Sequence, residues 1–354
     1  MSEESYWEML QALCTLDAPS GGEKPVTNWL AEAWRPYAAQ IERQGIGNLV
    51  AHVPGPGPRL LLCAHADELC FMVRYVEESG FLRVAMNHPA DSKFTIGFSY
   101  VGVAARVLRD DGTAIPALFA SSTGHVLTEQ QRAKTEKTWD DIFLDIGARN
   151  RVEAISWGIH VGSKVVFAAA PQRLGHYVTG KALDDRGGLV ALTQLLQALN
   201  PAELAYDLYV VGTVQEEPGL IGSDSICLAL KPDYAIAIDI GLAGDVPTTS
   251  FAHMPVRLGD GPTLVYRDGM AIYDEEMIGV LARLADEGHI PVQRALFYTY
   301  GSDAIACLRS GVRAALVAFP TRYTHTPFET ASLADMRALT SLLQRFVTTP
   351  PEAW

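Results

Sequence analysis

The chain of 354 residues is long enough for two domains, and with 48% hydrophobic and 19% charged residues it has the balance of a folded globular protein. Its formal net charge of −13 at pH 7 excludes a broad basic surface for nucleic acid or for an anionic membrane. The five cysteines are scattered without a C-x-x-C pair, which is typical of reduced, buried thiols in a cytoplasmic protein. Because the sequence begins without a signal-peptide pattern and no stretch reaches the roughly 18 apolar residues of a membrane span, we expect a cytoplasmic protein with no membrane and no nucleic-acid partner.

The first part of the chain, residues 1–69, alternates helical and strand patterns. The predicted elements are helices over Tyr6–Thr15 and Glu23–Ala39 and strands over Gly45–Val53 and Arg59–Ala64. The last of these is a short apolar run bounded by turns, which is typical of a strand buried on both faces. It ends at His65-Ala66-Asp67, and polar groups at the carboxyl end of a buried strand lie where open α/β sheets place their sites.

Residues 70–167 show a different pattern, in which strands follow one another with turns between them. The predicted strands are Val73–Val84, Tyr100–Leu108, Ile115–Ala120 and Lys164–Ala169, with a short helix over Glu153–Trp157. We therefore predict a small β-rich domain at 70–167, inserted into a first domain made of residues 1–69 and 168–354.

From residue 168 onward, strands again alternate with helices. The predicted helices are Asp185–Leu199, Ser223–Leu230, Tyr273–Asp286, Asp303–Ser310 and Leu333–Val347. The predicted strands are Leu208–Val214, Tyr234–Ile240, Gln293–Tyr298 and Ala314–Ala318. This alternation predicts an α/β fold whose mixed, mostly parallel sheet is sandwiched by helices.

Five places carry imidazoles or carboxylates just after a predicted buried strand or where a loop meets a helix. They are His65-x-Asp67, Asp184-Asp185, Glu216-Glu217, Asp239 and His325. One imidazole and one carboxylate for each of two metals, plus one shared carboxylate, make the ligand set of a dinuclear site. Nitrogen and oxygen ligands without sulfur suit zinc, cobalt or manganese, and two such ions about 3.5–4 Å apart can activate a bridging water.

Each of these places also has a simpler interpretation. Asp184-Asp185 alone fits a helix N-cap equally well, and a single histidine or a pair of glutamates is more often solvated than bound to metal. However, Glu216-Glu217 follow the apolar run D-L-Y-V-V-G-T-V, and Asp239 follows Y-A-I-A-I. Carboxylates attached to buried strands are costly unless they are paired or bind metal, so the combination favours a metal site.

Several stretches resemble a known family. They read A-H-A-D-E-L-C-F-M-V from Ala64, K-A-L-D-D-R-G-G from Lys181, T-V-Q-E-E-P-G-L-I-G-S from Thr213, I-D-I-G-L-A-G-D from Ile238 and P-T-R-Y-T-H-T from Pro320. In this order, and over nearly the whole chain, they resemble the M42 family of metallo-aminopeptidases, which includes glutamyl and deblocking aminopeptidases and the tetrahedral aminopeptidases. The resemblance implies a zinc-peptidase-like form of the α/β fold.

The resemblance also implies two metal ions in each subunit, with zinc expected first and cobalt or manganese as alternatives. One ion would be held by His65, Asp184 and Asp239. The other would be held by Glu217, His325 and the same Asp184, which would bridge the two ions.

The remaining site residues receive roles from the same resemblance. Glu216 would be the general base, and Asp67 would orient His65, since a metal-bound histidine usually donates its second ring N–H to an outer partner. The Asp184–Asp185 peptide would be cis. The expected substrates are short peptides, from which N-terminal residues are removed.

The resemblance further implies self-association through the inserted domain, with dimers building a dodecamer that encloses the active sites. The chain departs from the family pattern in two places. It has Tyr300-Gly301-Ser302-Asp303 where the family usually has G-G-T-D, and Ala120–His125 replaces a proline-rich segment. Substrate preference and interface detail therefore do not transfer from the family.

Three other hypotheses remain open from the sequence. A metal-dependent deacylase or carboxypeptidase-like amidohydrolase would use the same fold and metals on a different bond. A glycosidase would use paired acids without metal, but that leaves His65 and His325 without a role. A binding or scaffolding shell would need no catalysis, which fits poorly with a full set of candidate ligands.

Overall fold

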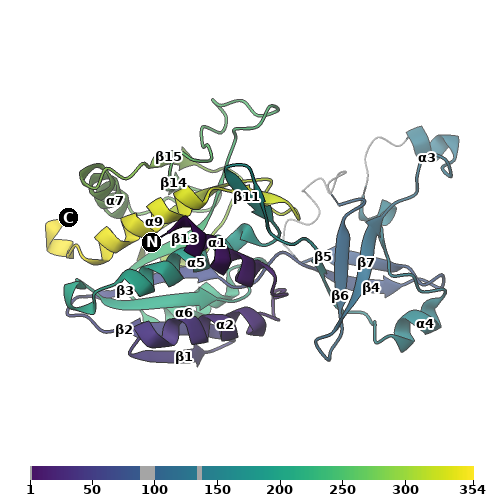
Figure 1. Cartoon of the computed structure of the whole chain (residues 1–354), viewed down its shortest axis with the longest axis horizontal. Helices are drawn as coiled ribbons and strands as arrows, with labels where there is room; N and C mark the ends of the chain where they lie inside the picture. Colours follow the sequence, from purple (N-terminus) through teal and green to yellow (C-terminus); the bar gives the residue numbers. More distant parts are fainter. Residues whose placement is uncertain (1, 88–99, 134–137) are drawn as a thin grey trace. The chain divides into compact units, whose positions relative to one another are not determined.

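The computed structural model describes residues 2–87, 100–133 and 138–354 (Figure 1). These residues form two compact units. One consists of Met1–Asp67 and Ala170–Trp354, and we call it the large unit. The other consists of Glu68–Ala169, and we call it the inserted unit.

The large unit contains one sheet, whose strands are β1 (Gln40–Gln44), β2 (Asn48–Val53), β3 (Arg59–His65), β10 (Gln172–Leu174), β11 (Tyr177–Gly180), β12 (Asp207–Thr213), β13 (Tyr234–Leu242), β14 (Thr263–Arg267), β15 (Gln293–Leu296), β16 (Arg313–Arg322) and β17 (Glu329–Ala331). Their order is β1-β2-β12-β3-β13-β16-β17-β11-β10, while β14 pairs with β16 and β15 with β14. The central strands β12, β3, β13 and β16 are parallel to one another. Hairpin partners such as β1–β2 and β10–β11 extend the sheet with antiparallel pairs.

The sheet is therefore mixed, as predicted, but the expectation that it is mostly parallel is not confirmed. Short connections, such as the one between β16 and β17, can join only antiparallel neighbours, and several strands are linked in this way. The parallel part is confined to the centre, where the apolar runs are. In β3 and β13 nearly every residue is buried, so both faces of these strands are covered.

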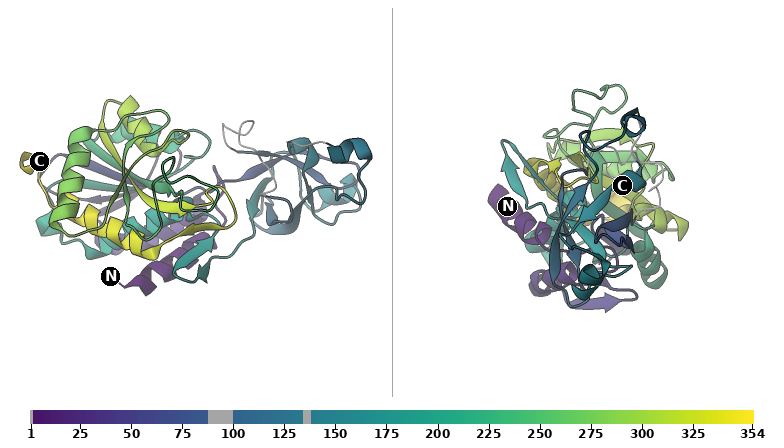
Figure 2. Two further views of the ribbon diagram at one scale, coloured as in Figure 1. Left: turned by 90° about the horizontal axis from the view of Figure 1, so that it is seen from above. Right: turned by 90° about the vertical axis from the view of Figure 1, so that its right-hand side faces the viewer.

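Helices of the large unit supply this cover. They are α1 (Glu3–Cys14), α2 (Lys24–Trp34), α5 (Leu183–Ala198), α6 (Ile221–Leu230), α7 (Glu275–Glu287), α8 (Asp303–Arg309) and α9 (Leu333–Val347). Helices α5 and α8 both pack on β3 and β13, and α9 lies beside α1 (Figures 1 and 2). No helix in the described part of the chain is long and apolar enough to cross a membrane.

The inserted unit is a closed barrel with its own core. Its strands are β4 (Phe71–Val76), β5 (Leu82–Met86), β6 (Ala104–Leu108), β7 (Ala114–Ala120), β8 (Phe143–Asp145) and β9 (Lys164–Phe167), and its helices are α3 (Glu129–Ala133) and α4 (Arg151–Ser156). The Phe71 ring lies at the centre of an aromatic cluster, 4.9 Å from Phe119 and 5.4 Å from Phe167. This β-rich core is separate from the apolar core of the large unit.

Three sequence predictions need correction at the level of single elements. The strand predicted over Val73–Val84 is a hairpin, because Gly80 takes a positive φ of 93° in the turn between β4 and β5. The strand predicted from Gly45 begins at Asn48 instead, and residues 45–47 form the turn from β1. The helix predicted to reach Ala39 ends at Trp34 and continues as a 3-10 turn over Arg35–Tyr37, where Pro36 interrupts the α-helical pattern. All five cysteines are buried and free, as predicted.

Candidate active site

The predicted site residues gather at the carboxyl ends of the central parallel strands. His65 is the last residue of β3, and Thr213, which pairs with it, is the last residue of β12. Ala237 of β13 pairs with Cys63, so Asp239 lies level with His65. The segment that follows β12, residues 214–220, carries Glu216 and Glu217, and we call it the glutamate loop. His325 follows β16, the neighbour of β13.

The side chains form two groups, each with ligand atoms within 4.8 Å of one another. The first group is His65, Asp184 and Asp239, and the second is Asp184, Glu217 and His325. Asp184 belongs to both: its Oδ1 lies 2.9 Å from Nε2 of His65, and its Oδ2 lies 3.6 Å from Nε2 of His325. The structure thus brings together all five predicted ligands. Imidazole nitrogen and carboxylate oxygen are suitable ligands for zinc, cobalt or manganese, so the donor set fits divalent ions.

The two acids of Asp184-Asp185 have different partners. Asp184 faces the histidines, whereas Asp185 accepts hydrogen bonds from the backbone N–H of Gly188 and of His65, each at 3.1 Å. The bond to Gly188 is an N-cap bond, since Asp184 and Asp185 lie outside helical φ/ψ. A side chain at position 188 would lie within 3 Å of the Asp185 carboxylate, which explains the glycine there. The Asp184–Asp185 peptide is cis, as expected.

Asp67 is fully buried and contacts both His65 and the glutamate loop. Its carboxylate lies 3.5 Å from Nδ1 of His65, and its backbone carbonyl lies 3.1 Å from the same atom. Its two side-chain oxygens accept the N–H groups of Glu216 at 3.0 Å and Glu217 at 3.3 Å. Its Oδ2 also accepts the hydroxyl of Ser20 at 2.7 Å. Asp67 therefore contacts the glutamate loop and Ser20 as well as the histidine that the sequence indicated.

Glu329 is a site residue that the sequence analysis missed. It is buried in β17, and its two carboxylate oxygens accept the backbone N–H groups of Asp184 at 3.1 Å and His325 at 2.8 Å. It thus fixes the backbone at two predicted ligands, one of which belongs to both groups. The one sequence signal was a single glutamate four residues after His325, and a single glutamate is more often solvated.

Arg186 lies behind the site as a fully buried cation. One of its terminal nitrogens donates to the carbonyl oxygens of Ala66 and, at 3.4 Å, Asp67. Its hydrogen bonds hold the backbone that follows His65. Tyr300 takes the place of the first glycine of the family pattern G-G-T-D. Its hydroxyl donates to the backbone carbonyl of Ile240, the residue after Asp239, at 2.7 Å.

The carboxylates of the site repel one another. Burial, followed by the charge of Asp184, raises the pKa of Asp239 well above its ordinary value. Burial also raises the pKa of Glu216 well above its ordinary value, and Asp239 and Glu217 add to this although His65 opposes it. Divalent cations would relieve this repulsion, so the electrostatics of the site favour metal binding.

The pKa values of His65 and His325 are shifted in opposite directions. Burial lowers the pKa of His65, but hydrogen bonds to the carboxylates of Asp184 and Asp67 outweigh it and raise that pKa well above its ordinary value. Burial lowers the pKa of His325, so its ring is neutral at pH 7 and offers a lone pair.

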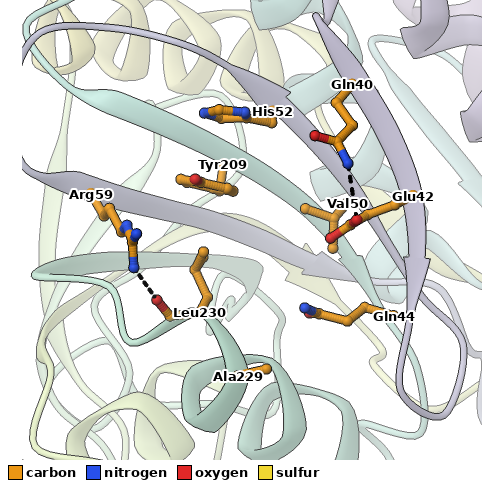
Figure 3. Close-up of a pocket in the computed structure, with 9 residues that line it drawn as sticks. All are labelled: Gln40, Glu42, Gln44, Val50, His52, Arg59, Tyr209, Ala229 and Leu230. Carbon is orange, nitrogen blue, oxygen red and sulfur yellow. Dashed lines mark hydrogen bonds between the residues drawn. The ribbon is translucent and has the colours of Figure 1, made fainter.

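A cavity of about 360 Å³ lies elsewhere in the large unit (Figure 3). It is lined by residues of β1 and β2, by the first residue of β3, by Tyr209 of β12 and by the end of α6. The ring of His52 stacks on Tyr209 at 4.3 Å, and Arg59 donates to the carbonyl of Leu230 at 2.9 Å. Arg59 starts β3, whereas His65 ends it, so this cavity is not part of the predicted site.

Comparison with known proteins settles the family. A sequence model described as M42 glutamyl aminopeptidase matches residues 47–342. The chain belongs to the M42 peptidase family. Among related proteins, FrvX of Escherichia coli strain K12 is 34% identical over 349 residues, which cover 97% of this chain and 95% of FrvX.

Solved structures agree with this assignment. An aminopeptidase of the archaeon Desulfurococcus kamchatkensis is 30% identical with a TM-score of 0.92, and the match covers 99% of this chain and 97% of that one. The TET1 peptidase of Pyrococcus horikoshii, which can assemble into a tetrahedron or a large octahedral shell, is 26% identical with a TM-score of 0.85, over 97% of this chain and 99% of that one. This M42 peptidase is therefore an enzyme of the aminopeptidase type, which hydrolyses peptide bonds, and it has groups that could hold metal ions.

Proposed function

We propose that this M42 peptidase is a dinuclear metal-dependent aminopeptidase that removes N-terminal residues from short peptides. The observation that supports this most directly is the position of Asp184, whose two oxygens face His65 and His325. A carboxylate shared by two ligand groups is the arrangement that a bridging ligand requires. Zinc is the first candidate for both ions, followed by cobalt and manganese.

Divalent ions bound to these groups would polarise the scissile carbonyl and lower the pKa of a water between them. The chain's own residues carry the proton transfers. Among the described residues, Glu216 belongs to neither ligand group, so its carboxylate is available to accept the proton of the attacking water. The same carboxylate then returns the proton to the leaving amine. Asp67 orients His65 and the glutamate loop while this happens.

The surrounding charge favours a substrate with a free N-terminus. Divalent ions would offset the charge of the ligand carboxylates, but Glu216 belongs to neither ligand group, and a carboxylate outside the groups attracts a peptide's α-ammonium. An acetylated N-terminus has no such charge. A deacylase or carboxypeptidase-like enzyme would instead require a group that receives a blocked amine or a free carboxylate.

The test is mass spectrometry of a short-peptide pool in which half of the peptides have acetylated N-termini. Metal-stripped enzyme is supplied with zinc, cobalt or manganese in separate reactions. We expect stepwise loss of N-terminal residues from the free peptides alone, and only after a metal is added. Cleavage confined to acetylated peptides, or to the carboxyl end, would instead identify the deacylase or carboxypeptidase-like enzyme. Full cleavage without metal would contradict the proposed chemistry.

We also propose that the inserted unit mediates dimerisation and that dimers build a dodecamer, which would admit short peptides only. Exposed apolar side chains support this: Val152 and Ile155 of α4 are 77% and 53% exposed, and Val161 is 64% exposed. Apolar surface of this kind commonly marks an interface between subunits. The ability of the related TET1 peptidase to form closed shells points in the same direction.

Light scattering coupled to gel filtration tests this assembly. We expect the wild-type protein to have the mass of a dodecamer, and Val152→Glu to shift it to smaller species. Gln130→Glu introduces the same charge at an exposed polar position of α3, another helix of the inserted unit, and is expected to leave the mass unchanged. A wild-type protein that stays monomeric at micromolar concentration would contradict the proposal.

A further inference from the structure

The glutamate loop contains three consecutive backbone N–H groups, those of residues 215–217, that all donate to buried carboxylates. Gln215 donates to Oε1 of Glu23 at 3.2 Å, whereas Glu216 and Glu217 donate to the two oxygens of Asp67. Gln215 has a positive φ of 54°. Successive N–H groups converge in this way when left-handed and right-handed residues alternate, and the resulting concavity binds anions. Here two side chains of the protein supply the anions.

Glu23 comes from a distant part of the chain and is only 6% exposed. It precedes α2, but among the described residues its side chain makes no capping hydrogen bond to that helix. Its Oε1 instead accepts the N–H of Gly21 as well as that of Gln215. The carboxylate therefore joins the segment before α2 to Gln215, the residue that precedes Glu216 in the glutamate loop.

The position of Glu23 is electrostatically unfavourable. Burial raises its pKa, and the neighbouring carboxylate of Asp67 raises it further. Ser20, three residues earlier, donates to the same Asp67 at 2.7 Å, so both carboxylates are held within one hydrogen-bonded cluster. Two buried acids of like charge reduce stability. Both of these carboxylates accept backbone N–H groups of the glutamate loop.

We propose that Glu23 is a positioning residue for Glu216. By holding the N–H of Gln215, it fixes the direction in which the chain enters Glu216 and hence the place of that carboxylate. This inference rests on the proposed role of Glu216 as the general base. A displacement of about 1 Å in a reacting group can reduce the rate about 100-fold, so an anchor that does not touch substrate can still control kcat.

Variants at position 23 distinguish the effect of side-chain length from the effect of the carboxylate charge. Glu23→Gln keeps an oxygen at Oε1 for both N–H groups but removes the charge, whereas Glu23→Asp keeps the charge and is too short to reach. We expect Glu23→Asp and Glu23→Ala to lower kcat about 10- to 100-fold, with KM within about 3-fold of wild type and metal content unchanged. Glu23→Gln is expected to recover at least about a third of the wild-type kcat.

The matched control is Glu32→Ala, on the exposed face of α2, where Glu32 is 77% exposed in its side chain. It is expected to show wild-type kcat, KM and metal content. Thermal unfolding of every variant identifies any that fail to fold, and if Glu23→Ala is among them, the comparison of Glu23→Asp with Glu23→Gln carries the test.

Two results would overturn the positioning role: a Glu23→Asp enzyme with wild-type kcat, or equal losses in Glu23→Asp and Glu23→Gln. Metal content measured on the same samples must stay constant, because loss of metal from Glu23→Asp would assign Glu23 to metal retention instead. Glu216→Gln is assayed in parallel. If that variant stays active, the proposed function of Glu216 fails, whatever the Glu23 variants show.

Discussion

The backbone N–H of Glu216 donates to Oδ1 of Asp67 at 3.0 Å, and this same carboxylate oxygen lies 3.5 Å from Nδ1 of His65. One buried side chain thus contacts a predicted ligand of the first metal and the predicted base. The second oxygen of Asp67 accepts the N–H of Glu217, a predicted ligand of the second metal. Asp67 therefore couples the two halves of the proposed centre through hydrogen bonds.

Replacing Asp67 is expected to disturb both halves together. In Asp67→Asn, one of the two oxygens becomes an NH₂ group that faces backbone donors, so one N–H loses its acceptor. We expect metal affinity or kcat to fall about 10- to 100-fold, as is usual when a partner of a metal ligand is removed. Competition with a chromophoric chelator measures the affinity. Asp286→Asn, on the exposed side of α7, is the control, and equal behaviour of the two variants would contradict the role of Asp67.

Adjacent glutamates are expected to fail in different ways. Glu216→Gln should retain both metal ions and lose kcat about 100- to 10,000-fold, because general-base catalysis contributes on that scale. Glu217→Gln should lose one ion, since Glu217 lies 3.5 Å from His325 within the second ligand group. Metal analysis and steady-state kinetics on the two variants distinguish the two roles. Loss of an ion from Glu216→Gln, with both ions kept by Glu217→Gln, would show that Glu216 is the ligand and Glu217 the base.

Several candidate ligands stood out in the sequence because they follow recognisable apolar strands, whereas their assignment to two ions came from the family resemblance. His65 ends one strand that is buried on both faces, and Asp239 interrupts another. Burial of an unpaired polar side chain in such a strand costs free energy, so these residues indicate a binding role. The large mixed sheet and the β-rich character of residues 70–167 followed from the same periodicity. Strand β1 could not be predicted from this periodicity, because all five of its residues are partly or fully exposed and none belongs to an apolar run.

Residues that act through the backbone could not be predicted in this way. Glu23 and Glu329 bind N–H groups of residues 192 and 145 positions away, and no local pattern reports such a pairing. Asp184-Asp185 illustrates the same limit. Spacing alone left open an N-cap or a metal site, whereas in the structure Asp184 lies beside His65 and Asp185 accepts a cap hydrogen bond.

Glu329 provides a third prediction. Its two oxygens hold the backbone of Asp184 and His325, so Glu329→Ala leaves two buried N–H groups without an acceptor. We expect the metal affinity to fall about 10- to 100-fold, and the unfolding free energy to fall by about 1–3 kcal/mol for each lost acceptor. Isothermal titration with zinc measures the first and urea denaturation the second. The control is Glu275→Ala, at an exposed position of α7. If Glu329→Ala binds zinc with the same affinity as Glu275→Ala, the assignment of Glu329 is wrong.

A fourth prediction concerns pH and a carboxyl group outside the site. Burial raises the pKa of Asp335 from 3.8 to about 6, although the N–H groups of Gly259 and Gly261 donate to it. Between these two pKa values the folded protein binds more protons at this position than the unfolded chain. The contribution of Asp335 to stability is therefore greatest below about pH 4 and is lost as the pH rises through about 6.

Urea denaturation of wild type and Asp335→Asn at several pH values measures this contribution. Asparagine does not titrate, so the difference in unfolding free energy between the two proteins isolates Asp335, whatever its absolute offset. We expect that difference to move in favour of the wild type by about 2 kcal/mol as the pH falls from 7 to 4. A difference that stays constant over this range, or moves in the opposite direction, would show that the folded-state pKa is not raised.

The central claim is that Asp184 is shared by two metal ions, and native mass spectrometry of the zinc-loaded protein tests it most directly. The account predicts two zinc ions per subunit in the wild type, one after Asp239→Ala or Glu217→Ala, and none after Asp184→Ala. Among the residues that the structure describes, Asp184 is the one that belongs to both ligand groups. Retention of one ion by Asp184→Ala, or a single ion in the wild type, would contradict a bridged pair.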